Sequence, residues 1–182
     1  MWFNTRAVVL TAGVGTGSSE IVAFDAALRA AAIADFNLIR VTSIVPPTVP
    51  VLHIPPPRRT EPIDGQGQML PTVYAVRATN RTGQQVSAAV GVGVSDLPDR
   101  SGVIFINEQT DGTADNCVRD LELMIMEGMR KLRRTDTYAF HHAAATATAD
   151  TTDEAWTCTM AACCFVDDDL MPYFADRAIP VD

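Results

Sequence analysis

The segment NLIRVTSIVPP, residues 37–47, contains a Thr42-Ser43 step with the chemistry to cut its own chain. If the backbone is held under strain, the hydroxyl of Ser43 can attack the carbonyl carbon of Thr42 and move the acyl group from nitrogen to oxygen. The ester can then eliminate, which leaves a pyruvoyl group on the downstream piece. Most Thr-Ser pairs in strands are inert, so two interpretations stay open: a self-cleaving site and an ordinary strand.

Asp25 is the second residue whose position indicates chemistry. Ile21, Phe24, Leu28 and Ala32 recur at three- and four-residue spacings, which predicts a helix, and Asp25 falls within this apolar face. A carboxylate there is costly unless it is paired or reaches a cleft. Asp25 is therefore either a grip for a cationic ligand or an early helical acid that bends back to solvent.

The glycine-rich segment TAGVGTGSS, residues 11–19, lies between a strand predicted over 6–10 and this helix. Its spacing puts Ser18 where the dinucleotide-binding fingerprint requires glycine, and no Gly-Lys-Ser/Thr follows. We therefore expect a strand-to-helix turn without bound phosphate. Ser18 or Ser19 would cap the helix, with Glu20 in its first turn.

No metal site is indicated by the histidines or cysteines. His141 and His142 are adjacent in a strand pattern and point to opposite faces, so they cannot chelate one ion together. Cys163 and Cys164 alternate in the same way. None of the four cysteines has a C-x-x-C partner, and we expect buried, reduced thiols.

Composition restricts the class of protein. A chain of 182 residues with 47% hydrophobic residues can bury one core, so a single domain is expected. The net charge of -8 argues against a nucleic-acid surface and is compatible with a cationic substrate. No apolar run reaches the roughly 18 residues of a membrane span, and the N-terminus lacks signal-peptide features. These features predict a cytoplasmic protein.

The predicted elements run strand, helix, several strands, helix and two strands. The extended segment 37–43 ends at two prolines, 49–68 has the composition of a surface loop, and the tail after Val166 is expected to be peripheral. Hairpin chemistry in NRTGQQ is expected to join the strands on either side of it. This order favours an α+β fold of antiparallel-rich sheets covered by two helices. The remaining predicted elements are strands over 71–79, 85–94, 102–107, 137–148 and 155–166, and a helix over 113–134.

The chain resembles the pyruvoyl-dependent arginine decarboxylases over about residues 11–166. The resemblance rests on NLIRVTSIVPP and on five further segments: AFDAAL (23–28), PTVY (71–74), SAAV (87–90), the strand from Gly102 and WTCTMAACCF (156–165). It implies a four-layer αββα sandwich. It also implies homotrimers, often paired into hexamers, with the active site between subunits.

The resemblance also implies roles at the cut. Ser43 would become the covalent pyruvoyl group, and Thr42 would become a new C-terminus. The single domain would thereby be divided into residues 1–42 and 43–182. Asn37 would be the polar partner near the processing site.

For the substrate, the resemblance implies arginine, which would be decarboxylated to agmatine. Asp25 would bind the guanidinium by a bidentate, charge-assisted pair, and Leu28 would contact the substrate beside it. The substrate amine would form a Schiff base with the pyruvoyl ketone, which draws the electrons released with carbon dioxide. An acid would then protonate the carbanion.

The sequence departs from the family at that acid. Family members carry a catalytic Glu in the strand that begins here with Gly102, and an ungapped match puts Ile106 at its position. Glu108 lies two residues further, on the same face of a continued strand, and is the candidate proton donor. It is equally compatible with a solvated strand-end acid. The alternative function is therefore a paralogue without catalysis, or with another substrate, that serves as a structural or regulatory subunit.

Overall fold

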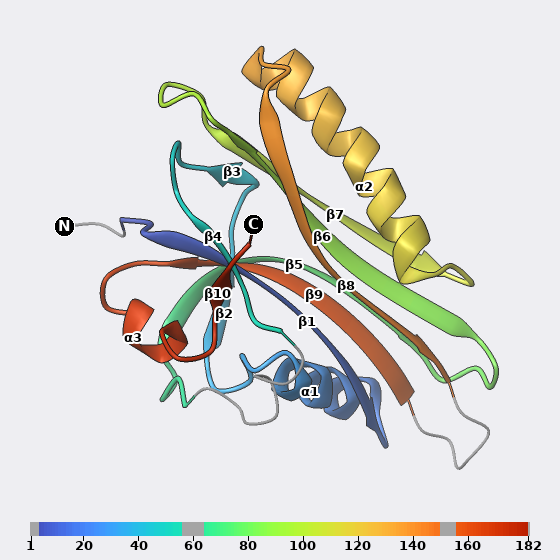
Figure 1. Ribbon diagram of the computed structural model, residues 1–182. Helices are drawn as coiled ribbons and strands as arrows, with labels where there is room; N and C mark the ends of the chain where they lie inside the picture. Colours follow the sequence, from blue (N-terminus) through green and yellow to red (C-terminus); the bar gives the residue numbers. More distant parts are fainter. Residues whose placement is uncertain (1–3, 56–63, 150–155, 182) are drawn as a thin grey trace.

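The computed structural model describes residues 4–55, 64–149 and 156–181, and it has four layers: helix α1, a six-stranded sheet, a four-stranded sheet and helix α2 (Figure 1). The six-stranded sheet has the order β10-β4-β1-β9-β5-β2, and the four-stranded sheet the order β3-β7-β6-β8. This confirms the predicted αββα sandwich and its α+β class. No helix in the described ranges is long and apolar enough to cross a membrane.

The strands of the six-stranded sheet are β1 (Ala7–Gly17), β2 (Asn37–Arg40), β4 (Val51–His53), β5 (Met69–Thr79), β9 (Trp156–Val166) and β10 (Ile179–Pro180). The four-stranded sheet consists of β3 (Ile44–Val45), β6 (Gln85–Ser95), β7 (Gly102–Thr110) and β8 (Tyr138–Thr148). The helices are α1 (Glu20–Ala30), α2 (Ala114–Gly128), which continues into a π-helical turn (Met129–Arg133), and α3 (Met171–Phe174).

One core fills the space between the two sheets, and a second lies between α1 and the six-stranded sheet. Alternate residues of β1 and β9 enter the first core from one side, and alternate residues of β6 and β7 enter it from the other. Cys163 belongs to this core, whereas Cys164 faces α1, so the two adjacent thiols point to opposite faces as predicted. All four cysteines are buried and free, and burial raises the pKa of Cys164 to about 12.

The glycine-rich segment is not the turn that we expected from the sequence. β1 continues through it to Gly17, and its alternate glycines face α1. A Cβ atom on Gly15 would lie 2.2 Å from Ala27 N, and one on Gly13 would lie 2.2 Å from Ala27 O. The glycines are therefore present so that the helix backbone can lie directly on the strand. The predicted cap is confirmed, since Ser19 Oγ accepts from Val22 N over 3.4 Å.

The buried face of α1 differs from the prediction at Ile21, whereas Leu28 and Ala32 are buried and Phe24 packs against the core as predicted. Ala23, Ala27 and Leu28 are buried, whereas Ile21 is 70% exposed. Because the helix lies close to a glycine strand, alanines fit the closest contact, and Ile21 and Val22 are turned to solvent. Asp25 is consequently exposed, and the expectation that it lies on the buried face is wrong.

Two connections were also predicted wrongly. NRTGQQ does not close a hairpin, because β5 pairs with β9 in one sheet and β6 pairs with β7 and β8 in the other. The expected loop 49–68 contains β4, which pairs in parallel with β1, while its residues 56–63 lie outside the described ranges. Pairing partners depend on distant segments, which local turn chemistry does not reveal.

The tail after Val166 is not peripheral either. Leu170 and Phe174 are buried, and the Phe174 ring stacks on Phe36 with 5.6 Å between ring centroids. An aromatic contact between distant segments has no periodic signal in a short tail. The tail therefore closes the core beside α1.

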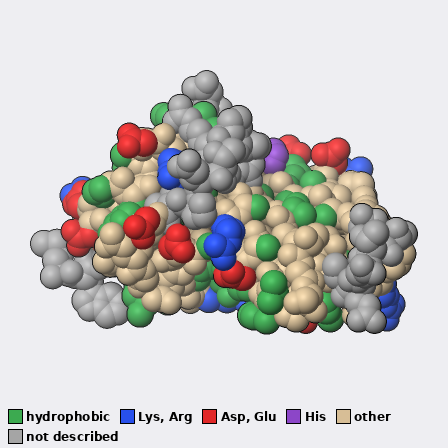
Figure 2. Space-filling model, turned by 90° about the horizontal axis from the view of Figure 1, so that it is seen from below, with side chains coloured by type: hydrophobic (Ala, Val, Ile, Leu, Met, Phe, Trp, Pro, Cys, Tyr) green, Lys and Arg blue, Asp and Glu red, His purple; other side chains and the backbone are tan. Residues whose placement is uncertain are grey.

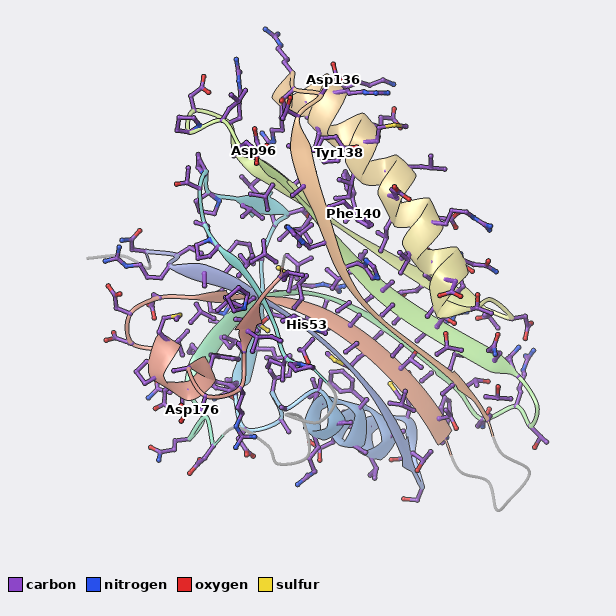
Figure 3. The ribbon with its side chains drawn as sticks, in the orientation of Figure 1. His53, Asp96, Asp136, Tyr138, Phe140 and Asp176 are labelled. Atoms are coloured by element: carbon purple, nitrogen blue, oxygen red, sulfur yellow. The ribbon has the colours of Figure 1, made fainter. Side chains whose placement is uncertain are left out.

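Helix α2 covers the outer face of the four-stranded sheet and buries Cys117, Leu121 and Ile125 against it. Thr113 caps it by accepting from Asn116 N over 3.2 Å. Gly93 on β6 faces Ile125 of this helix, so this small residue permits a close approach of α2 to the sheet. Tyr138 and Phe140 lie along β8 and pack with the end of α2 (Figure 3).

We expect Gly15→Ala to destabilise the protein by about 3 kcal/mol or more, because its Cβ would overlap helix backbone that cannot move aside. Gly83→Ala is the matched control: Gly83 has φ +76° and nothing within 4 Å of its Cβ position. Its cost should be the left-handed backbone penalty of about 1–2 kcal/mol. Urea unfolding measures both, and equal losses would contradict the close contact of α1 with β1.

Candidate active site

The Thr42-Ser43 bond lies where the chain passes from one sheet to the other (Figure 1). β2 ends at Arg40 on the edge of the six-stranded sheet, and β3 begins at Ile44 on the edge of the four-stranded sheet. The prediction of one continuous strand over 37–43 is therefore wrong. Alternation of side chains fits any extended chain and does not tell which sheet each half joins.

Both sheets hold the chain next to this bond. On the upstream side, Val41 N donates to Thr72 O of β5 over 3.2 Å. On the downstream side, Ile104 N of β7 donates to Ser43 O over 3.0 Å. The connection is thus anchored at both ends by different sheets.

Between these anchors the backbone makes a tight turn centred on Ser43. Ile44 N donates to Thr42 O over 3.1 Å, a bond between residues two apart. Thr42 is exposed and Ser43 is half-buried. The carbonyl that Ser43 would attack is therefore already hydrogen-bonded.

A cavity of about 460 Å³ opens beside the turn. Three of its side chains are large and exposed: Ile39 at 43%, Ile44 at 53% and Met69 at 60%. Exposed hydrophobic side chains gathered in one place indicate a surface that another molecule covers. The cavity is lined by Thr5, Ile39, Val41, Thr42, Ile44, Met69, Pro71 and Phe165.

Two charged side chains bind the edge of β5 beyond the end of β2. Arg40 Nη2 donates to Tyr74 O over 3.0 Å, and its guanidinium carbon lies 4.7 Å from the Tyr74 ring centroid. Two residues further, Val76 N donates to Glu108 Oε1 over 2.9 Å. Sequence reasoning missed this role of Arg40, since its only signal was a cation at the end of an edge strand.

Glu108 lies on the strand face that we predicted but not beside Ser43. β7 runs to Thr110, so Ile104, Ile106 and Glu108 share the face toward the six-stranded sheet. Glu108 is four residues from Ile104, which binds Ser43 O, and this corresponds to about 13 Å along the strand. Its carboxylate instead accepts a hydrogen bond from Val76 N of β5 and so links the four-stranded sheet to the six-stranded sheet.

Asn37 stands at the other end of β2. Its Nδ2 donates to Gly67 O over 2.6 Å, and Gly67 has φ +73°. About 10 Å of strand separates Asn37 from Arg40. Within one chain, Asn37 therefore supports the 65–68 turn and does not reach Ser43.

Asp25 and Leu28 belong to the outer helical layer. Asp25 Oδ2 accepts from Arg29 Nη2 over 2.8 Å, and both side chains are more than half exposed. Leu28 is 8% exposed and packs in the core between α1 and the six-stranded sheet. The six-stranded sheet thus stands between Asp25 and the strand that follows Ser43. Figure 2, which views the molecule from the α1 side, shows acidic side chains among hydrophobic ones.

A second cavity, of about 420 Å³, lies between the start of α1 and β5. Its wall contains Tyr74 and Val76, whose backbone groups bind Arg40 and Glu108. Phe24, the neighbour of Asp25, also lines it. The other lining residues are Glu20, Ile21, Ala78 and Cys158.

The two adjacent histidines are both partly removed from water. Burial lowers the pKa of both His141 and His142, and the His142 ring stacks on Phe140 at 5.6 Å between centroids. Among the residues that the structure describes, no group of three His, Cys, Asp or Glu side chains is arranged to hold a metal ion.

The family model described as pyruvoyl-dependent arginine decarboxylase matches residues 7–170. The pyruvoyl-dependent arginine decarboxylase of Pyrococcus horikoshii is 33% identical over 104 residues, which are 57% of this chain and 62% of that protein. The Picrophilus torridus protein of the same name is 34% identical over 97 residues, 53% of this chain and 52% of its own. The Methanococcus maripaludis protein of that name is 29% identical over 121 residues, which are 66% of this chain and 69% of that protein. The aligned part thus spans only about half to two thirds of these relatives.

The contact between Glu108 and β5 gives a prediction. Glu108→Ala should raise hydrogen exchange at the Val76 amide by about tenfold, because the loss of one hydrogen bond of about 1.4 kcal/mol frees that N–H. Glu108→Gln keeps an acceptor oxygen and should leave the amide protected. NMR exchange rates for Val76 decide, and equal rates in both variants would contradict the contact.

Proposed function

The chain belongs to the pyruvoyl-dependent arginine decarboxylase family, and on this premise we propose that it cuts itself between Thr42 and Ser43 and decarboxylates arginine to agmatine and carbon dioxide. The observation that carries the proposal is the turn at Ser43. The hydrogen bond to Thr42 O polarises the carbonyl that Ser43 would attack, and the two sheets hold the residues on either side, which supports the proposal. We propose a cytoplasmic location for this activity.

The residues at the turn fit a pyruvoyl group made from Ser43. The side chain is half-buried, and Thr42 lines an adjoining cavity of about 460 Å³ with room for a small amino acid. Ile104 N would hold the carbonyl group next to the new ketone. When formed, the pyruvoyl group supplies an electron sink for the loss of carbon dioxide. The chain's own task is to position the substrate, exclude water and deliver a proton.

We propose that the site is completed by a second copy of the chain. Asp25 is on the outer face of one sheet and Ser43 enters the other, so their joint use requires two subunits. Each chain carries two exposed apolar areas, one on α1 at Ile21 and one at the cavity around Ile44. Contact of one with the other would be head-to-tail, and such contacts form a ring when the rotation between subunits closes. A trimer is the ring that the family resemblance supports.

In such a site Asp25 would release Arg29 and bind the substrate guanidinium. The exchange costs little, because an exposed pair four residues apart on a helix contributes about 0.3–0.5 kcal/mol. A bidentate pair with arginine, shielded from water by the partner subunit, would be stronger. Asn37 would act near the cut of a neighbouring chain, and Leu28 would support the helix behind Asp25.

The proton donor is the weakest point of the family pattern in this chain. Ile106 occupies the acid position, and the Glu108 carboxylate is bonded to Val76 N. This observation favours one alternative, a cleaved or uncleaved paralogue without decarboxylase activity that serves in an oligomer. A protein that cuts itself but releases carbon dioxide from no amino acid would support the alternative.

Self-cleavage is the first prediction. Purified wild-type protein should convert without added factor into pieces of residues 1–42 and 43–182, because every group needed for the acyl shift is in the chain. Ser43→Ala should stay in one piece. Intact mass spectrometry measures both, and an unbroken wild-type chain after long incubation would rule out the proposal.

The second prediction concerns Asp25. Asp25→Asn should raise the KM for arginine by roughly 30-fold, equivalent to about 2 kcal/mol of charge-assisted bonding, with self-cleavage and stability nearly unchanged. Steady-state carbon dioxide release and a thermal melt give the numbers. Unchanged arginine kinetics would remove Asp25 from the site.

A mixing control tests whether the site is shared. Asp25→Asn and Ser43→Ala chains that are co-expressed should form mixed oligomers with partial activity, since each variant supplies what the other lacks. If Asp25 and Ser43 act within one chain, mixtures should be no more active than the Asp25→Asn chains they contain.

A further inference from the structure

Two backbone N–H groups, one in the turn at Ser43 and one on β7, donate to two different carbonyl oxygens of this turn. Ile44 N lies 3.1 Å from Thr42 O, and Ile104 N lies 3.0 Å from Ser43 O. Both are ordinary hydrogen bonds to the uncharged carbonyl oxygens, so each fixed donor already stands beside an oxygen that could take up charge. These two oxygens are also the atoms on which negative charge develops when a serine peptide converts to a pyruvoyl group.

We propose that the two amides serve successive steps of the self-cleavage: the Ile44 N–H stabilises the acyl shift, and the Ile104 N–H stabilises the elimination that follows. The inference rests on the proposed function and goes beyond it, because it assigns the groups that catalyse formation of the cofactor. Neither group is a side chain, so no sequence pattern could have indicated it.

In the first step, Ser43 Oγ forms a bond to the Thr42 carbonyl carbon. The carbonyl π pair moves to Thr42 O, where the Ile44 N–H meets it. The bond between Thr42 C and Ser43 N then breaks, and the hydroxyl proton passes to that nitrogen. The product is an ester with a free amine, so atoms and charges balance.

In the second step, the proton on Ser43 Cα leaves to water, and its electron pair forms the bond from Cα to Cβ. The bond between Cβ and Oγ breaks and releases Thr42 as a carboxylate. Negative charge is delocalised onto Ser43 O as the proton leaves, and the Ile104 N–H stabilises this charge by its hydrogen bond to that oxygen. The remaining enamine takes up one water and releases ammonia to give the ketone.

The arrangement depends on the crossing between sheets. In a regular strand, the N–H of one residue and the carbonyl two residues earlier do not bond, whereas a three-residue turn brings them together. The Ile104 bond continues the pairing of β3 with β7 by one residue, since Ile44 pairs with Val103. One donor thus comes from the turn and the other from the sheet that the chain enters.

The test replaces single amides by esters, which removes one N–H and leaves the side chain in place. Residues 44 and 104 are both isoleucine, so the same hydroxy-acid analogue is incorporated at either site of the full chain. Ile54 is the matched control: its N–H donates to Leu10 O over 3.0 Å in the buried core, away from the turn. Hydroxylamine, which cuts esters, reports the intermediate, and intact mass spectrometry reports the pyruvoyl piece.

The ester at 44 should slow loss of the intact chain on the order of 10²-fold, without a hydroxylamine-sensitive form beyond the engineered linkage. The ester at 104 should leave the first step fast and accumulate a hydroxylamine-sensitive bond between 42 and 43, with pyruvoyl formation slowed to a similar degree. The control at 54 should cleave at the wild-type rate. Wild-type rates for 44 and 104 would overturn the inference and leave the proposed function intact, whereas a wild type that never cleaves would overturn both.

A second measurement does not depend on folding of the ester chains. In the full Ser43→Ala chain, which cannot cleave, the amides of Ile44 and Ile104 should exchange with solvent on the order of ten times more slowly than in an unstructured peptide. Protection at Ile44 is informative because its side chain is 53% exposed. An unprotected Ile44 amide would overturn the assignment of the first step.

Discussion

The chain crosses between two sheets in the three residues after Arg40, and this short connection determines what the rest of the molecule can do. Packed sheets lie about 10 Å apart, and four extended steps from residue 40 to residue 44 reach about 14 Å at most. Little slack remains for the turn that Ser43 makes. Because Val41 N is bound to one sheet and Ser43 O to the other, both ends of the connection are held in place. A cut at this point would leave each new end attached to its own sheet.

The close contact of α1 with β1 is the second constraint, and it determines where Asp25 lies. Glycines on β1 let the helix backbone approach, so alanines fill the contact, while Ile21, Val22 and Asp25 face outward. Asp25 is among these outward residues, paired with Arg29. The lack of side chains on the β1 glycines thus determines that Asp25 lies on the surface of the molecule.

The lengths and types of the long elements followed from the sequence because they depend on local periodicity. The strand over 102–107 and the helix over 113–134 match β7 and α2 with their π-helical continuation closely. Pairing did not follow, because NRTGQQ has hairpin chemistry yet connects strands of different sheets. The glycine-rich strand was missed for a related reason. Its glycines make room for the backbone of α1, and this contact leaves no signal in the local sequence. At the candidate site, Thr42 and Ser43 could be named from residue types, whereas the hydrogen bonds around them belong to the three-dimensional fold.

The presence of an acid at position 108 and an isoleucine at position 106 has an energetic explanation. Ile106 packs against the core between the sheets, where a carboxylate would lose its hydration without a ready partner. Glu108 is two residues nearer the rim, exposed to solvent, and receives a hydrogen bond from Val76 N. In an isolated chain, a carboxylate at position 108 therefore destabilises the fold less than one at position 106 would. Since the Glu108 carboxylate accepts a hydrogen bond from Val76 N, proton delivery from this strand would require that the carboxylate exchange its bond to β5 for one to a substrate.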